Sequence, residues 1–232
     1  MKNLKKIFEK YGIKLSTDQE KQFDKYFSML VETNKVMNLT AITEENEVLI
    51  KHFLDSALPE KFIKQNATIV DVGSGAGFPS IPLKIVRPDL QIYMVDSLNK
   101  RITFLNDVIN ELQLKNTHAF HDRAEDFAAK NREKFDISVA RAVAPLNTLS
   151  EYLLPLVKIG GNAIIYKSAK LNEEIKEAHK AITVLGAKID SIQRFFIEEE
   201  GLERNILILN KISQTQKKYP RNKNQPKLNP IK

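Results

Sequence analysis

The chain has 232 residues, of which 42% are hydrophobic, and a formal net charge of +7, so it is long enough to bury one substantial core. It has no cysteine, which excludes a disulfide framework, a thiolate zinc site and a cysteine nucleophile, and its four scattered histidines lead us to expect no metal site. No apolar run has the length of a signal peptide or a membrane span, so we expect a soluble, cytoplasmic protein. Nothing in the sequence suggests more than a monomer.

The N-terminal part predicts a small layer of helices, which we treat as a subdomain of residues 1–60. Apolar residues at helical spacing predict a short amphipathic segment over residues 4–11. A longer helix begins at residues 17–20, where Thr-Asp-Gln-Glu matches a capping box. A third helix, capped by Thr43, must end before Pro59, because a residue that precedes proline avoids helical geometry.

The third predicted helix carries one polar pair. His52 and Asp55 are three residues apart and therefore lie on the same helical face. The interpretation we favour is a local hydrogen bond within the helix, and the alternative is a functional pair.

From Ala67 onward, predicted strands alternate with predicted helices, which is typical of a mostly parallel sheet with right-handed crossovers. A turn at residues 198–201 joins the last two strands into a hairpin. The fifth strand is expected to follow a turn at Gly160 and Gly161. The predicted strands are 69–72, 91–95, 117–121, 135–140, 162–167, 188–197 and 205–212. The predicted helices start near Pro79 and Ala124 and cover 101–112, 146–156 and 171–185.

The first of these strands leads directly into three alternating glycines, Gly73, Gly75 and Gly77. Glycine adopts positive φ readily and lets the backbone approach a ligand, and the following helix directs its free N–H groups to the same point. A dinucleotide fingerprint would need glycine where Phe78 stands, and no Gly-Lys-Ser/Thr follows to make a P-loop. The remaining D-x-G-x-G-x-G pattern resembles the first motif of class I S-adenosylmethionine-dependent methyltransferases. The alternative is a turn that only links strand and helix.

Asp96 supports the interpretation of the loop as a ligand site. It ends the second strand, where a carboxylate is placed to accept hydrogen bonds from ribose hydroxyls. Loop and sheet together predict an α/β, Rossmann-like class I methyltransferase domain over residues 61–212. Its sheet would be seven-stranded and mostly parallel with a terminal antiparallel hairpin. Its cofactor would be S-adenosyl-L-methionine.

Further candidates follow from the carboxyl ends of the strands, where ligands of open parallel sheets bind. The backbone of Ala124 and Glu125, after the third strand, would border the adenine. Arg141 ends the fourth strand and Lys167 the fifth. Two cations beside a cationic sulfonium would repel it unless an anionic group compensates, so they indicate a phosphate-bearing substrate. The alternative for Arg141 and for Lys167 is that each is merely an exposed cation at the end of a strand.

The sequence also excludes two kinds of nucleic-acid methylation. No [DN]-P-P-[FYW] sequence follows the fourth strand, so the clamp for exocyclic amines is missing. Methylation of a pyrimidine carbon by covalent attack needs a cysteine, which the chain lacks. A ring nitrogen with a free lone pair, such as guanine N7, attacks a methyl group without losing a proton, so positioning suffices and no general base is required.

The positive charge of the chain is concentrated at its C-terminal end, and we treat residues 213–232 as a basic tail. Positive charge without acids is typical of an arm that binds a polyanion, and the alternative is a solvated, disordered terminus. No acid occurs after Asn210, and the basic residues there are Lys211, Lys217, Lys218, Arg221, Lys223, Lys227 and Lys232.

Six motifs carry a more specific resemblance: N-K-x-x-N-L-T at 34–40, I-K-H-F-L-D-S at 50–56, D-V-G-S-G-A-G-F-P at 71–79, D-S-x-x-K-R at 96–101, R-A-E at 123–125 and S-V-A-R-A at 138–142. Together they resemble the bacterial ribosomal RNA small-subunit methyltransferase G family, also called glucose-inhibited division protein B. The resemblance implies methyl transfer from S-adenosylmethionine to N7 of one guanine of 16S rRNA near the decoding region. It implies 16S rRNA or the small ribosomal subunit as the partner.

The resemblance also implies roles for individual residues. The predicted cofactor contacts are Gly73, Gly75, Gly77, Phe78, Asp96, Ala124, Glu125 and Arg141. Arg141, beside the reacting end of the cofactor, and Lys167 are the predicted catalytic residues. The predicted RNA contacts are Asn38, Lys100, Arg101, Arg123, Lys217, Lys218 and Arg221. The tail departs from the family, because Asn224 and Gln225 replace its usual Gly-Thr pair.

Two other functions stay open at this point. A small-molecule methyltransferase of the same fold would have no use for an acid-free tail or for strand-end cations. An RNA-binding factor that keeps S-adenosylmethionine as a structural ligand would bind without turnover, since a fold does not determine a function.

Overall fold

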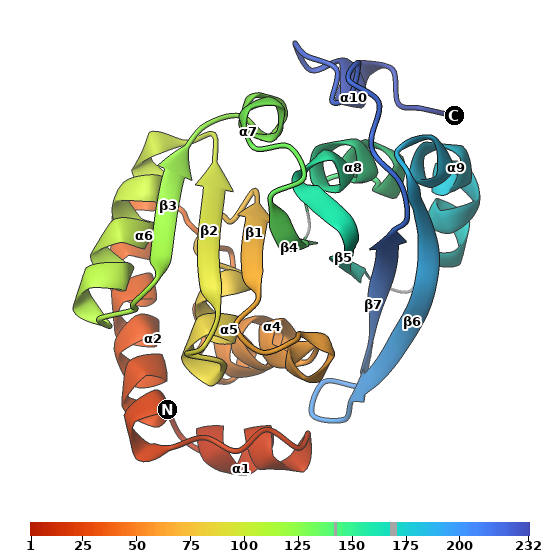
Figure 1. The fold of residues 1–232 in the computed structure, drawn as a ribbon. Coiled ribbons are helices and arrows are strands. Elements are labelled where there is room, and N and C mark those ends of the chain that lie inside the picture. The colour runs from red at the N-terminus through yellow and green to blue at the C-terminus, as the bar shows by residue number, and fades with distance from the viewer. Residues whose placement is uncertain (142, 168–170) are drawn as a thin grey trace.

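The computed structural model describes residues 1–141, 143–167 and 171–232 and shows a seven-stranded sheet between two layers of helices (Figure 1). The strand order is β3-β2-β1-β4-β5-β7-β6, with β1 to β5 parallel and β7 antiparallel to both its neighbours. The predicted sheet and its terminal hairpin are therefore confirmed. The strands are β1 Thr68–Val72, β2 Gln91–Asp96, β3 Thr117–His121, β4 Phe135–Arg141, β5 Val157–Lys167, β6 Ala187–Ile197 and β7 Leu202–Lys211.

Alternate residues of the strands enter two separate cores. Ile69 of β1 packs with the N-terminal helices, α5 and α6, whereas Val70 packs with α7, α8 and α9 on the other face. None of the helices in the described ranges is both long and apolar enough to cross a membrane. The helices are α1 Leu4–Lys10, α2 Thr17–Met37, α3 Glu45–Glu47, η1 Val48–Leu54, α4 Asp55–Ala57, η2 Glu60–Phe62, α5 Ser80–Val86, α6 Asn99–Glu111, α7 Ala124–Lys130, α8 Leu146–Leu153, η3 Leu154–Leu156, α9 Leu171–Val184 and α10 Gln225–Leu228.

Two predicted helix caps are each wrong by one residue. The capping box of α2 joins Ser16 to Gln19, each side chain bonding the backbone N–H of the other residue. The third predicted helix consists of α3, the π-helical η1 and α4, and Glu44 rather than Thr43 caps it by accepting from the N–H of Glu47 at 2.9 Å. Ser16 and Thr17 are both effective caps, so residue type alone did not decide between them, whereas Glu44 caps α3 although glutamate is not among the preferred N-cap residues.

The predicted turn at Gly160 and Gly161 is also wrong, because both glycines lie inside β5. Gly160 has φ +83°, and a Cβ on Gly161 would lie 2.4 Å from the carbonyl oxygen of Asp136. The register between β4 and β5 shifts between Phe135 and Ile137. The glycines therefore permit a bulge with close backbone approach, and the strand continues through them.

The C-terminal tail packs against the α7–α8 side of the domain (Figure 1). The guanidinium of Arg132 donates to the carbonyls of Thr215 and Tyr219. Arg221 pairs with the buried carboxylate of Glu151 at 2.7 Å. The guanidinium of Arg221 is thus already engaged within the protein, and its contact with RNA stays a prediction.

Lys211, the last residue of β7, lies in the core and anchors the start of the tail. Its ammonium donates to the carbonyls of Leu154 and Val157 at 2.7 and 3.2 Å and to the hydroxyl of Thr215 at 2.8 Å. It also pairs with Glu133 at 3.3 Å. The sequence-based count of tail charges included Lys211, but its side chain is fully buried and is not available to a polyanion.

We expect Lys211→Met to lower the free energy of unfolding by about 1–3 kcal/mol, because two buried carbonyls and Glu133 lose their donor. Urea denaturation measures the change, and limited proteolysis reports release of the tail. Lys217→Met, at an exposed position, is the control. If the two variants unfold alike, Lys211 does not anchor the tail.

Candidate active site

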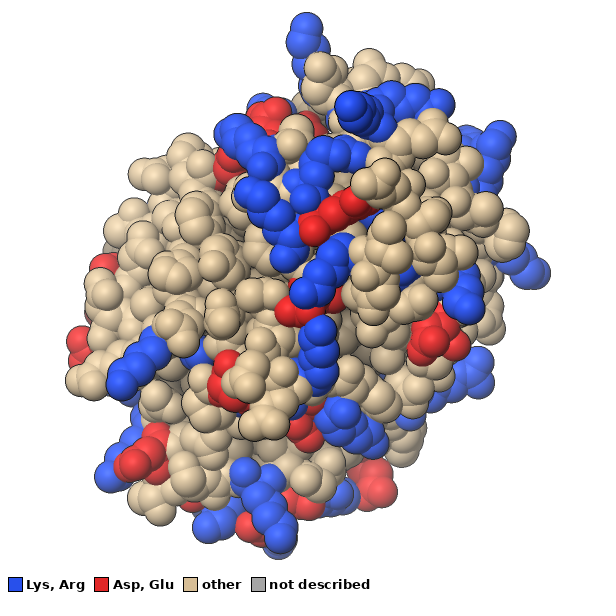
Figure 2. Space-filling view, viewed as in Figure 1, with Lys and Arg blue, Asp and Glu red and all other residues tan. Residues whose placement is uncertain are grey.

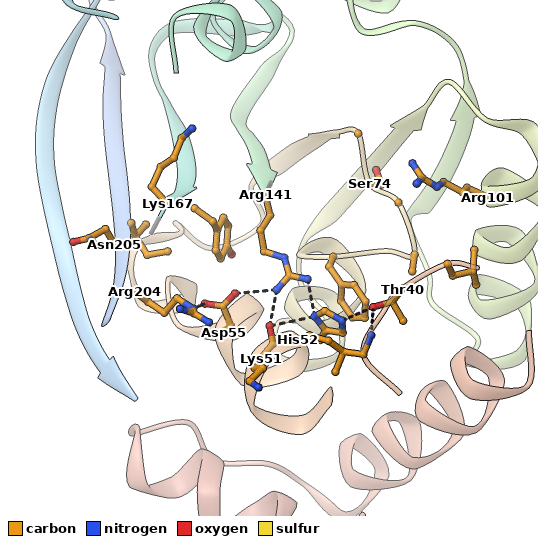
Figure 3. Close-up of a pocket in the computed structure, with 18 of the residues that line it drawn as sticks. Thr40, Lys51, His52, Asp55, Ser74, Arg101, Arg141, Lys167, Arg204 and Asn205 are labelled. Carbon is orange, nitrogen blue, oxygen red and sulfur yellow. Dashed lines mark hydrogen bonds and ion pairs between the residues drawn. The ribbon is translucent and has the colours of Figure 1, made fainter. Parts of the chain in front are cut away.

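A cavity of about 640 Å³ opens at the carboxyl ends of the central strands. The glycine loop between β1 and α5, the ends of β4 and β5 and residues of η1 and β7 line it. Figure 3 shows His52, Asp55 and Arg141 pointing toward one another, with Arg204 beside Asp55. The strand-end cation Lys167 lines the same cavity. The structure therefore brings together the glycine loop and both predicted catalytic residues.

All three loop glycines adopt positive φ, at +76°, +60° and +102°. A Cβ on Gly73 or Gly77 would lie 2.8 or 2.6 Å from a neighbouring side chain, so these two positions need glycine for close packing. A Cβ on Gly75 would meet nothing closer than 4.0 Å, and Gly75 lines the cavity. The loop thus leaves open space above Gly75, where a ligand can approach its backbone.

Asp96 holds the loop in place from the end of β2. Its side chain accepts hydrogen bonds from the N–H of Gly75 at 2.9 Å and of Leu98 at 3.0 Å, and it pairs with Arg101 at 3.1 Å. Parallel pairing of β1 with β2 brings the two strand ends together. The predicted contact of Asp96 with a ribose stays a prediction, and Arg101 lies beside that carboxylate.

Arg141 is held in place by residues of the N-terminal layer. One of its terminal nitrogens donates to the carbonyl of Lys51 at 2.8 Å and to Asp55 at 2.9 Å. The other lies 3.0 Å from Nδ1 of His52. The guanidinium lies over the ring of Phe78 at 5.0 Å, and His52 stacks on the same ring at 4.4 Å. These contacts orient Arg141 at the cavity wall.

His52 is neutral at physiological pH. Burial, followed by the nearby charge of Arg141, lowers the pKa of His52 to about 4. Nδ1 of His52 lies 3.0 Å from the guanidinium of Arg141, which only donates, and 3.2 Å from the carbonyl of Lys51, which only accepts. We assign Nδ1 as the acceptor from the nearer, charged donor and place the proton on Nε2, which then donates to the hydroxyl of Thr40 at 2.9 Å. His52 is therefore a fixed neutral link between β4 and the segment that follows α2.

A buried carboxyl lies beneath the loop. Asp71 in β1 is fully buried, and neither of its carboxyl oxygens has a hydrogen-bond partner among the described residues. Burial raises the pKa of Asp71 to about 7, and the nearby hydroxyl of Ser80 and the charge of Arg141 offset only part of this effect. The carboxyl therefore titrates near neutral pH, and a cationic ligand in the cavity would favour its charged form.

We expect the contribution of Asp71 to the free energy of unfolding to fall as pH rises from about 4 to 7, because the folded chain binds the Asp71 proton more tightly than the unfolded chain does. His52, whose pKa folding lowers, contributes in the opposite direction, so the variant is compared with the parent at each pH. Asp71→Asn should remove the Asp71 contribution, so its stability relative to the parent should rise between about pH 4 and 7. Urea denaturation across that range measures it, with Asp107→Asn at an exposed position of α6 as the control. Parallel pH profiles for parent and Asp71→Asn would contradict the assignment.

Lys167 is less free than the sequence suggested. Its ammonium pairs with Glu174 of α9 at 2.6 Å and donates to the carbonyl of Ala144 at 3.1 Å. Its side chain is only 10% exposed, and it lines the cavity beside Asn205. The carboxylate of Glu174 compensates its charge, so Lys167 alone does not require an anionic ligand.

The residues predicted to border adenine lie at the start of α7, next to the tail. Glu125 is buried and accepts from the backbone N–H of Asn224 at 3.3 Å. Arg123 donates to the side chain of the same asparagine at 3.2 Å. Arg123 and Glu125 line a separate hollow with residues 222–224, and Ala124 is half-buried beside them. The tail therefore contacts the predicted adenine region.

Other predicted RNA contacts are exposed around the cavity. Asn38 ends α2 with φ +48°, and Lys100 at the start of α6 donates to the carbonyl of the adjacent Met37 at 3.1 Å. The structure thus brings Asn38 and Lys100 together from segments far apart in the sequence. Lys217 and Lys218 are exposed on the tail.

Sequence reasoning missed part of the cavity wall. Asp55 pairs with both Arg141 and Arg204, the latter at 3.1 Å, and no hydrogen bond joins it to His52 among the described residues. The favoured interpretation of a local hydrogen bond between His52 and Asp55 is therefore wrong. Their spacing on one helical face was the available signal, because both side chains contact Arg141, and the alternative of a functional pair stays a prediction.

The model of the family described as rRNA small subunit methyltransferase G matches residues 19–206. The chain belongs to this family. Two relatives, both named Ribosomal RNA small subunit methyltransferase G, come from Staphylococcus haemolyticus and Brevibacillus brevis and are 49% and 50% identical to the chain. The alignments cover 98% and 95% of this chain and 96% and 94% of the relatives. The family predicted from the six motifs is confirmed.

Solved structures support the fold. The structure of TYW2 from M. jannaschii in complex with AdoMet is 16% identical, has a TM-score of 0.58 and covers 74% of this chain and 80% of its own. At 16% sequence identity the similarity between the two structures is evidence for the fold alone, and it confirms the predicted class I methyltransferase fold. Membership of the rRNA small subunit methyltransferase G family confirms the predicted enzyme class and its cofactor, S-adenosylmethionine.

Proposed function

We propose that the protein methylates N7 of one guanine in 16S rRNA, near the decoding region, with S-adenosylmethionine as the methyl donor. Its family and its relatives support this proposal. The observation that carries it is the cavity, in which the open side of Gly75 meets Arg141 at the carboxyl ends of the central strands. A methyl donor on the loop would thus lie next to a fixed guanidinium that can orient a nucleotide.

The residues around the loop fit S-adenosylmethionine. Open space above Gly75 suits a ligand that passes close to the backbone, and Asp96 offers carboxylate oxygens at the end of β2 for ribose hydroxyls. Asp71 provides a buried carboxyl that a cation would ionise. When bound, the cofactor supplies an electrophilic methyl group. We propose that the start of α7, at Ala124 and Glu125, borders its base.

The chain then has to position guanine and leave its N7 lone pair free. Contacts with Lys51, His52 and Asp55 use three of the five N–H donors of Arg141, and among the described residues the other two have no partner and can serve a substrate. A donor directed to guanine O6 orients the base without occupying N7. No proton leaves N7 during the attack, so a neutral His52 that cannot act as a strong acid is compatible with the chemistry.

We propose that the substrate RNA approaches along cations at this end of the sheet. Figure 2 shows a row of blue side chains running from the tail toward the middle of the face, interrupted by few red ones. Exposed Lys100, Arg123, Lys217 and Lys218 would contact phosphates, and such contacts weaken as salt rises. We propose that the enzyme acts as a cytoplasmic monomer on the small ribosomal subunit or its RNA.

The first experiment is methyl transfer from labelled S-adenosylmethionine to small subunits from cells that lack this activity. We expect one 7-methylguanosine in 16S rRNA, identified by nuclease digestion and mass spectrometry. Transfer to a small acceptor, insensitive to salt, would instead favour a small-molecule enzyme. Cofactor binding without any transfer would favour an RNA-binding factor and contradict the proposal.

Arg141→Ala should lower kcat by at least about 100-fold while cofactor affinity changes little, because the guanidinium is proposed to orient the transition state. Single-turnover transfer and calorimetric titration with S-adenosylmethionine separate the two effects. Arg194→Ala, at an exposed position of β6, is the control and should leave both unchanged. Undiminished transfer by a folded Arg141→Ala variant would remove Arg141 from the mechanism.

A further inference from the structure

A second groove lies on the sheet, outside the cavity of the active site. Its volume is about 470 Å³, and β1 to β4 and α7 with the turn after it line it. Among the described residues the two cavities share no lining residue. The proposed methylation reaction therefore leaves this groove unexplained.

The groove exists because α7 is short. The opposite face of β3 is packed by α6, which has 13 residues, whereas α7 has 7. β3 is an edge strand, and two alternate residues of it, His118 and Phe120, are exposed on the α7 side. Figure 2 shows a broad tan area where Figure 1 draws β2 and β3, bordered by blue side chains where α7 lies. An apolar strip of the sheet is left uncovered.

Aromatic rings form the floor of the groove. The rings of Tyr93 and Phe120 are nearly parallel, with an angle of 7° and centroids 6.0 Å apart. Phe127 and Phe135 continue the cluster at 5.6 Å from Phe120 and 5.3 Å from Tyr93. Phe120 is 37% exposed, so one side of this floor faces solvent. The exposed ring of Phe120 and the nearly parallel ring of Tyr93 suit a planar nucleobase, which stacks on such rings regardless of base type, whereas Phe127 and Phe135 are buried and tilted and support them.

Cations lie along the rim of the groove. Lys130 and Lys134 line it, both exposed, and Asp122 is the single acid among its lining residues. Asp122 pairs with Lys130 at 2.8 Å, and the ammonium of Lys134 bonds only neutral oxygens, of which the side-chain carbonyl of Asn131 lies 3.2 Å away. The rim thus carries net positive charge, which complements a phosphate backbone, and together with the aromatic floor it fits a nucleotide, whose phosphate is anionic and whose base is planar.

We propose that this groove binds an unpaired nucleotide of the RNA substrate, with its base stacked on Phe120 and its phosphate beside Lys134. The proposal rests on the proposed function only for the identity of the RNA. A stacked nucleotide here anchors the substrate at a distance from the reacting guanine. It contributes to RNA affinity and not to the chemical step.

The chain has no tryptophan, so Phe120→Trp places a single tryptophan in the groove, which can be excited selectively over the six tyrosines. We expect a single-stranded oligouridylate of about 12 nucleotides to quench this fluorescence, because a base stacks on the indole. A duplex of equal length should quench it much less. The matched control is Phe196→Trp, which replaces an exposed phenylalanine on β6, at the opposite edge of the sheet.

Phe120→Ala should raise the KM for small subunits by about 5- to 150-fold, the range for loss of one base–aromatic stack. It should leave kcat and affinity for S-adenosylmethionine unchanged. Polarisation of a labelled oligouridylate measures the RNA affinity of each variant directly, and cofactor titration shows that each variant is folded.

Three results would overturn the proposal. The first is bound RNA without quenching of Trp at position 120, and the second is equal quenching in the Phe196→Trp control. The third is a Phe120→Ala variant that binds free rRNA normally but intact subunits weakly, which would assign the groove to a ribosomal protein. If no RNA is ever methylated while position 120 is still quenched, the proposed function fails and the groove proposal stands.

Discussion

The half-buried guanidinium of Arg141 joins the two parts of the molecule that form the active-site cavity. It ends a central strand, binds the carbonyl of Lys51 and the carboxylate of Asp55 in the N-terminal layer, and lies over Phe78 of the glycine loop. The side chain of Asp55 is only 6% exposed, so loss of either partner would leave a poorly solvated charge. The N-terminal helices are thereby one wall of the cavity.

The two faces of the sheet are covered unevenly, and this asymmetry separates two kinds of surface. At the carboxyl ends, loops and helices line a cavity with few free charges, since Lys167 and Arg204 are paired with Glu174 and Asp55. Across β2 and β3, the short α7 leaves aromatic rings uncovered. The first surface offers polar groups held in place by ion pairs, which suits a precise chemical step, and the second offers aromatic rings, which suit sequence-tolerant stacking.

Most of the fold could be predicted from sequence because its strongest signals are local. Alternation of strands and helices admits few topologies, and strands rich in β-branched residues bounded by glycine and proline are distinct. The errors fall where two local solutions have similar energy. Ser16 and Thr17 are both good caps, and a glycine pair permits either a turn or a bulge, which the approach of Gly161 to the Asp136 carbonyl decided.

The sequence by itself determined the family, because the glycine pattern, Asp96 and the six motifs are local features, and the structure brings the glycines and Asp96 together at the ends of adjacent parallel strands. Only the tertiary structure decided which side chains meet Arg141, since Asp55 precedes it by 86 residues. Helical spacing predicts which face a residue occupies and contains no information about what packs opposite. For the same reason the burial of Lys211 and the exposure of Phe120 depended on the packing of distant segments.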